Sequence, residues 1–162
     1  MNNKMTGVKD FLLMRFVPER TQVGLAILRV WTGAELFLQH GWEKRPERWP
    51  FYMAHFIQNP IGIGTHASFF VAFTSDFVCS ILLIIGLGTR WAALFVIGNI
   101  FVAWAFIQHF LFLDHNDHGE LMLLYIGALL LLVIAGPGTA SIDRILARSA
   151  RRISEGEKNE SN

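Results

Sequence analysis

The stretch that decides the fold is "RWAALFVIGNIFVAWAFIQHFLFL", which runs from residue 90 to residue 113. After Arg90 it contains no Asp, Glu, Lys or Arg, and its length exceeds the roughly 20 residues that an α-helix needs to cross a bilayer. A helix that is apolar on every side belongs in a membrane or a large core. We therefore expect residues 90–113 to span a membrane.

Three further windows have the same character, at 119–137, 21–42 and 66–88, although charged residues interrupt the last two. Of the 162 residues, 52% are hydrophobic and 17% are charged, whereas a soluble domain has about 25% charged residues. One small core cannot cover so much apolar surface. The sequence therefore predicts an all-α, polytopic membrane protein with a four-transmembrane-helix bundle over residues 21–142.

The remaining segments are short. Helical spacing of Val8, Phe11 and Leu12 predicts an interfacial segment within residues 1–20. A long loop over 43–65 joins the first two spans, and the basic tail, residues 143–162, is expected to be partly disordered. Because the net charge is only +1, nucleic acid is not an expected partner. The lipid bilayer is the expected partner, and a homo-oligomer is left open.

The distribution of positive charge predicts the orientation of the spans. Ten Lys and Arg fall on the side that holds the termini and the turn at 88–90, and three fall on the opposite side. Lys and Arg gather on the cytoplasmic side of membrane proteins. We therefore expect both termini to be cytoplasmic. The expected location is the cell membrane of a bacterium or archaeon. All six histidines then lie near or beyond the outer edge.

Three polar residues fall near the middle of the predicted spans: Arg29, Asp76 and Asn99. Charged side chains at this depth are costly and usually face partners inside the bundle. We predict an ion pair between Arg29 and Asp76, assisted by Asn99. This layer either locks the helices together or takes part directly in function.

A second polar layer is predicted nearer the outer face. A rise of 1.5 Å per helical residue places Glu35 and Tyr125 about 10 Å inside that face, and Gly33, Gly98 and Gly127 would let the backbones approach. Such groups around an apolar cavity can bind a quinone head group or relay its protons. The alternative is that they only hold the outer half of the bundle together. The layer comprises Glu35, Gln39, His40, Gln108, His109, Glu120 and Tyr125.

The polar segment "DHNDHGE", residues 114–120, separates the third and fourth spans. Asp117 can cap the fourth helix, and Glu120 completes an arrangement like a capping box. Histidine and carboxylate also suit zinc, iron or copper, so a metal site is the alternative. Its spacing matches no established zinc signature, and histidines at the membrane edge do not suit a buried haem. The weak metal candidates are His109, His115 and His118.

Four short motifs occur in a characteristic order. They are His-Gly-x-x-Lys at 40–44, Gly-x-x-Thr-Arg at 86–90, the Glu that opens the fourth span, and Gly-Pro-Gly-x-x-Ser-x-Asp at 136–143. Over about residues 24–146 this order resembles the DoxX family of small membrane proteins. The resemblance implies a four-helix membrane protein associated with redox chemistry. The related DoxD subunit belongs to a thiosulfate:quinone oxidoreductase. Family members often carry Glu where this chain has Asp76.

Two functions are therefore considered. The first is a redox-associated membrane subunit that interacts with quinone. If it is an enzyme, it is an oxidoreductase that passes electrons from a sulfur compound to quinone, together with a partner redox subunit or sulfurtransferase. The second is a non-catalytic membrane scaffold that recruits redox or other proteins through the loop at 43–65 and the basic tail.

Overall fold

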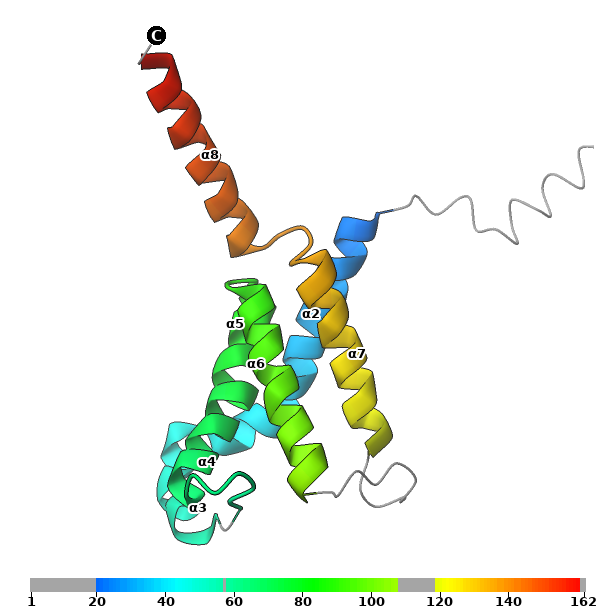
Figure 1. Cartoon of the computed structure of the whole chain (residues 1–162), viewed down its shortest axis with the longest axis vertical. Coiled ribbons are helices and arrows are strands. Elements are labelled where there is room, and N and C mark those ends of the chain that lie inside the picture. The colour runs from blue at the N-terminus through cyan, green and yellow to red at the C-terminus, as the bar shows by residue number, and fades with distance from the viewer. Residues whose placement is uncertain (1–19, 57, 108–118, 161–162) are drawn as a thin grey trace, which may run out of the picture.

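The computed structural model describes residues 20–56, 58–107 and 119–160, and every regular element among them is a helix (Figure 1). The all-α prediction is therefore confirmed for this part of the chain. The predicted interfacial segment lies outside the described residues, apart from Arg20. Most of the connection before the last predicted span, residues 108–118, also lies outside them.

The first long helix is α2 (Thr21–Leu36), which continues as a π-helical turn over Phe37–Gly41. Two short 3-10 turns, Trp42–Lys44 and Pro46–Arg48, then lead to the helix α3 (Trp49–His55). Pro46 and Pro50 occupy first-turn positions, where their missing N–H groups leave no intrahelical bond unmade. The segment predicted as a long loop thus contains a helix of its own.

The second long helix runs continuously from Thr65 to Ile85. It comprises α4 (Thr65–Phe73), a π-helical stretch over Thr74–Cys79, and α5 (Ser80–Ile85). Gly86 ends it in the left-handed conformation, with φ 73°, which glycine adopts without steric cost.

The third long helix is α6 (Thr89–Val102), which continues as a π-helical turn over Ala103–Ile107. It is followed by α7 (Gly119–Ala135) and α8 (Ile142–Glu160). The structure thus has a helix where the sequence predicts a partly disordered tail. The physical reason is amphipathicity, because Ile142, Ile145 and Leu146 recur at helical spacing.

Two helices among the described residues are long and apolar enough to cross a membrane, Thr65–Ile85 and Thr89–Phe106. They correspond to the predicted spans at 66–88 and 90–113. Helix α7 is apolar but shorter, with 17 residues. Large apolar side chains face outward from these helices, and Trp91 and Ile134 are 80% and 76% exposed. Such a surface is typical of a protein surrounded by lipid rather than water.

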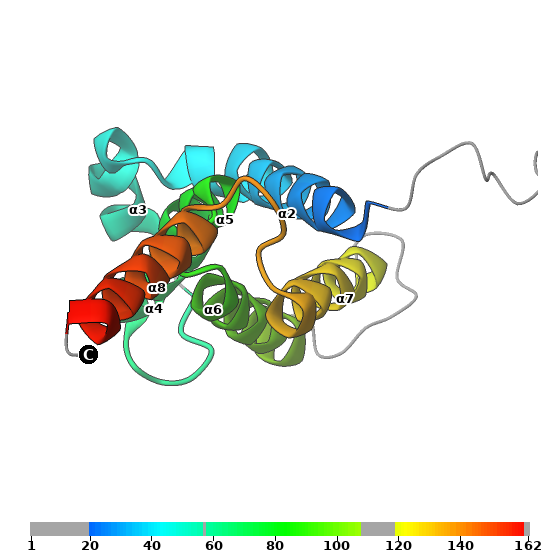
Figure 2. The same cartoon turned by 90° about the horizontal axis from the view of Figure 1, so that it is seen from above.

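The long helices lie side by side, as Figures 1 and 2 show, and apolar side chains fill the space between them. Helix α2 packs against α5 and α7, and α6 packs against α7 and the stretch Thr74–Cys79. We call the end of this bundle where α8 projects the α8 end, and the opposite end the α3 end (Figure 1). The core is formed by residues from α2, α5, α6 and α7, including Leu36, Leu83, Val96, Leu129 and Leu132.

Asp143 stabilises the α8 end of the bundle through hydrogen bonds. Its carboxylate accepts hydrogen bonds from the backbone N–H groups of Gly88 (2.7 Å) and Thr89 (2.9 Å), at the N-terminus of α6. Its own N–H donates to the carbonyl oxygen of Gly86 at 2.9 Å. A carboxylate is favoured at a helix N-terminus, where unpaired N–H groups carry partial positive charge. The start of α8 is therefore tied to the turn between α5 and α6.

Aromatic rings attach α3 to α4. The Trp49 ring lies 5.3 Å from the ring of Phe70 and 5.2 Å from that of Phe73, in both cases edge to face. Tyr52 stacks on Phe69 with ring centroids 5.1 Å apart, and the Trp49 indole N–H donates to the carbonyl oxygen of Lys44 at 3.1 Å. These contacts hold the segment 43–55 against the second long helix.

Close helix packing depends on two of the small residues in α2 and its continuation. An added Cβ at Gly33 would lie 3.0 Å from the carbonyl oxygen of Ser80, and one at Gly41 would lie 2.2 Å from that of Asp76. The expectation that Gly33 allows close approach is confirmed. Gly98 and Gly127 do not serve this purpose, because no atom of another described segment lies within 4 Å of an added Cβ at either position.

We predict that Gly41→Ala lowers the free energy of unfolding in detergent by about 1–3 kcal/mol, because the methyl group would overlap a backbone carbonyl that cannot move freely. Gly24→Ala is the matched control, since an added Cβ there has no atom within 4 Å. Thermal unfolding followed by circular dichroism measures both variants. Equal stability of the two variants would contradict the close approach at Gly41.

Candidate functional site

A cavity of about 560 Å³ lies between α2, the stretch Thr74–Cys79, α6 and α7. Its size is within the usual range for small-molecule sites, about 300–1,000 Å³. The apolar part of its wall is Leu36, Ile100, Ala103, Leu121 and Met122. The polar part is Glu35, Gln39, His40, Asp76, Asn99 and Tyr125.

Three π-helical segments border this cavity. Phe37–Gly41 contributes Gln39 and His40, Thr74–Cys79 contributes Asp76, and the third begins at Ala103. A π-helix bonds residue i to residue i+5, so it turns side chains to directions that a regular α-helix would not give them. In this way Glu35 and His40, five residues apart, both reach the cavity.

Asp76 is the centre of a polar network beside the cavity. Lys44 Nζ donates to Asp76 Oδ2 at 2.9 Å, and Asn99 Nδ2 donates to Asp76 Oδ1 at 3.3 Å. Lys44 Nζ also donates to the carbonyl oxygen of His40 at 3.0 Å. The side chains of Lys44 and Asp76 are only 16% and 13% exposed, so the ion pair is largely removed from solvent.

The close approach at Gly41 explains how Lys44 reaches its partner. Gly41 sits against the backbone of Asp76, and Lys44 follows it by three residues, about one helical turn. The motif His-Gly-x-x-Lys therefore combines a close contact between two helices with the cation that neutralises Asp76. The motif was recognisable in the sequence, but the sequence did not predict which residue Lys44 contacts.

The predicted ion pair between Arg29 and Asp76 is wrong. Arg29 is buried, with 1% exposure, and its Nη2 donates to the carbonyl oxygen of Ala140 at 3.0 Å, beyond the end of α7. The acidic group that interacts with it electrostatically is Asp143. The guanidinium extends toward the α8 end because Gly86 leaves room for it: an added Cβ there would lie 1.8 Å from Arg29 Nη1. Asn99 does contact Asp76, as expected.

The outer polar layer is brought together only in part. Glu35, Gln39, His40 and Tyr125 all line the cavity. Glu35 and Tyr125 are half-buried and interact electrostatically, whereas Gln39 and His40 are exposed. Glu120 is exposed on the first turn of α7 and does not line the cavity.

The remaining predicted site residues lie outside the described residues. These are Gln108, His109, His115, Asp117 and His118. The proposed cap of the fourth span and the histidine metal site therefore stay predictions. In the part of the chain that the structure describes, no group of three or more His, Cys, Asp or Glu side chains is placed to hold a metal ion.

The family model described as DoxX matches residues 24–109, which is more than half of the chain and covers most of α2 and all of α4, α5 and α6. No curated protein and no solved structure matches.

We predict that removing either partner of the Lys44–Asp76 pair destabilises the fold, by about 2–4 kcal/mol for Lys44→Met, close to the range for buried pairs. Asp76→Asn should cost less, because a lysine released from its partner can extend its flexible chain to the aqueous boundary. The double variant should cost less than the sum of the two single variants.

Unfolding in mixed micelles of mild detergent and SDS measures these free energies. Glu47→Gln is the control, because Glu47 pairs with Arg45 on the surface with 75% exposure of its side chain, and exposed pairs contribute little. Additive losses in the double variant would mean that the two side chains do not stabilise each other.

Proposed function

The chain belongs to the DoxX family of membrane proteins, and from that premise we propose that it is a redox-associated subunit that binds a quinone head group in the cavity between α2, α6 and α7. In this proposal it is a multi-pass protein of the cytoplasmic membrane of a bacterium or archaeon. The observation that carries the proposal is the composition of the cavity wall.

A quinone head group needs an apolar slot for its ring and hydrogen-bond donors for its two carbonyl oxygens. The cavity offers Leu121 and Met122 as apolar wall, and His40, Gln39 and Tyr125 as donors. Because these groups come from the π-helical turn after α2 and from α7, they can approach a ring from two sides.

Reduction of a quinone to a quinol takes two electrons and two protons. Glu35 and His40 are suited to supply the protons, because a carboxyl group and an imidazole both exchange protons readily at neutral pH when their surroundings are adjusted. His40 is exposed and Glu35 is half-buried, so a proton can pass from solvent to the inner carboxylate. The electrons come, in this proposal, from a sulfur compound that is oxidised on a partner subunit.

The arrangement of positive charge supports both termini being cytoplasmic. Arg90, Arg144 and Arg148 belong to the α8 end, and Lys44 and Arg48 belong to the α3 end (Figure 1). With the further arginines of α8, the α8 end is the more positive, and the positive end of a membrane protein faces the cytoplasm. The cavity then opens in the outer half of the bundle.

A second candidate function is a membrane scaffold without catalysis of its own, and α8 is the observation that favours it. This helix projects away from the bundle (Figures 1 and 2). Ile145 and Leu146 on it are 61% and 55% exposed, next to exposed arginines such as Arg148. An exposed apolar stripe beside positive charge suits an acidic helical partner. The same helix would dock the partner subunit that the first proposal requires.

We expect purified protein to bind a short-chain ubiquinone analogue, and Glu35→Gln and His40→Ala each to weaken binding at least about tenfold, because each removes a polar contact to the head group. Titration calorimetry in detergent measures the affinity. Glu43→Gln and His66→Ala are the matched controls, since both residues are exposed and outside the cavity wall. Unchanged affinity in both cavity variants would place the quinone elsewhere.

The orientation has its own test. A cysteine in place of Glu47 should react with a membrane-impermeant maleimide on intact cells, and one in place of Arg148 should react only after the membrane is opened. Both native side chains are exposed, and the native Cys79 is buried, so the wild-type protein gives a low background. The opposite labelling pattern would reverse the proposed topology.

A further inference from the structure

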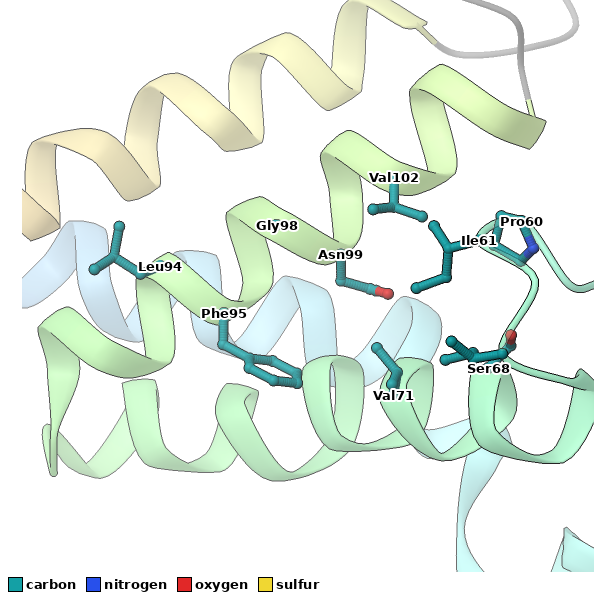
Figure 3. A pocket seen from close by; sticks show the side chains of 10 residues that line it. Pro60, Ile61, Ser68, Val71, Leu94, Phe95, Gly98, Asn99 and Val102 are labelled. Carbon is teal, nitrogen blue, oxygen red and sulfur yellow. The ribbon is translucent and has the colours of Figure 1, made fainter.

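A second cavity, of about 290 Å³, lies between α4 and α6 (Figure 3). The connection before α4 covers one end of it, through Pro60 and Ile61. Asn99 lines this cavity as well as the larger one. Its contact with Asp76 therefore lies at the boundary between the two cavities. We call the smaller cavity the lateral groove.

The lateral groove has a buried polar group at one end. Ser68 lies in the first turn of α4, is 7% exposed, and its Oγ has no hydrogen-bond partner among the described residues. A buried hydroxyl without a partner costs about 1–3 kcal/mol, so such a group usually has an acceptor. Among the described residues, no acceptor in the wall of the groove lies within hydrogen-bond distance of this hydroxyl. An occupant of the groove is the group that can supply one.

Apart from Asn99, the rest of the groove wall is apolar and extends along the helices. On α6 its wall runs from Val102 back to Leu94, which at 1.5 Å per residue is about 12 Å. Phe95 belongs to this α6 side of the wall, and Val71 belongs to the α4 side (Figure 3). The groove is therefore a slot that lies parallel to the helix axes, with its polar group at the end nearer α3.

We propose that the lateral groove binds an acyl chain of a membrane glycerolipid, whose ester carbonyl accepts a hydrogen bond from Ser68 Oγ. In a glycerolipid a polar ester group is followed by an apolar chain, and in the groove the polar Ser68 hydroxyl is followed by an apolar wall. Its ester carbonyls lie at the boundary of the hydrocarbon region, where α4 begins, and its chain runs inward along the helices. Ser68 is three residues from the start of the Thr65–Ile85 helix, which places its hydroxyl at that boundary.

Gly98 keeps the groove open. It is exposed toward the groove, and no atom lies within 4 Å of an added Cβ. A larger side chain at this position would occupy the slot without overlapping protein atoms. Gly127 on α7 is its matched control, because it is also a helical glycine with no atom within 4 Å of an added Cβ, and it lines neither cavity.

The test uses the full chain, stripped of lipid in maltoside detergent and then titrated with palmitoyl-oleoyl-phosphatidylglycerol. Native mass spectrometry counts the lipids that remain bound. Wild type and Gly127→Leu should retain one lipid with equal affinity, and Gly98→Leu should lose at least tenfold in affinity. Ser68→Ala should weaken binding several-fold without lowering lipid-free stability, because the hydroxyl has no hydrogen-bond partner among the described residues to lose.

Equal retention by Gly98→Leu and wild type would overturn the proposal, as would wild type that retains no lipid. Retention of a quinone in the groove in place of the glycerolipid would also overturn it. Glu35→Gln and His40→Ala should bind the lipid normally, so failure of the quinone proposal and failure of this one give different results. If Gly98→Leu does not fold, Gly98→Ala and Ser68→Ala provide the same comparison.

Discussion

The ion pair between Lys44 and Asp76 is the interaction on which the site depends. It joins the 3-10 turn Trp42–Lys44 to the middle of the second long helix, and Asn99 extends it to α6. A carboxylate at this depth in an apolar bundle is costly unless a cation and hydrogen-bond donors surround it. Gly41 makes the arrangement possible, because only a residue without a side chain lets the two backbones meet there. Both cavities border this network.

A second set of polar contacts, made by Asp143 and Arg29, stabilises the α8 end. Asp143 caps α6, and Arg29 donates to the carbonyl oxygen of Ala140, which has a φ of 54°. A left-handed conformation at a non-glycine residue is unfavourable by about 1–2 kcal/mol, and the bond from Arg29 helps to offset this. Between the two polar groups the bundle is held by apolar packing. Each end is therefore fixed independently, which leaves room for cavities in the half nearer α3.

The two cavities suit different molecules. The larger one combines carboxylate, imidazole and phenol groups with an apolar wall, a set that can bind and protonate a polar ring. The lateral groove has one buried hydroxyl and an elongated apolar wall, a set that suits a chain. Asn99 belongs to the walls of both cavities. The redox function and the lipid site are thus distinct proposals about adjacent spaces.

The four short motifs supplied the resemblance to the DoxX family. Apolar runs, charge and spacing in the sequence were enough to predict an all-helical membrane protein and to place Glu35, Gln39, His40 and Tyr125 around one cavity. These features depend on helical periodicity and depth, which are local properties of the chain. Only the tertiary structure decided which cation pairs with Asp76. Arg29 and Asp76 have suitable depths, but Gly86 directs the guanidinium to one end and Gly41 brings Lys44 to the carboxylate. Side-chain direction and backbone distance between helices arise from packing, so no count along a single helix could supply them.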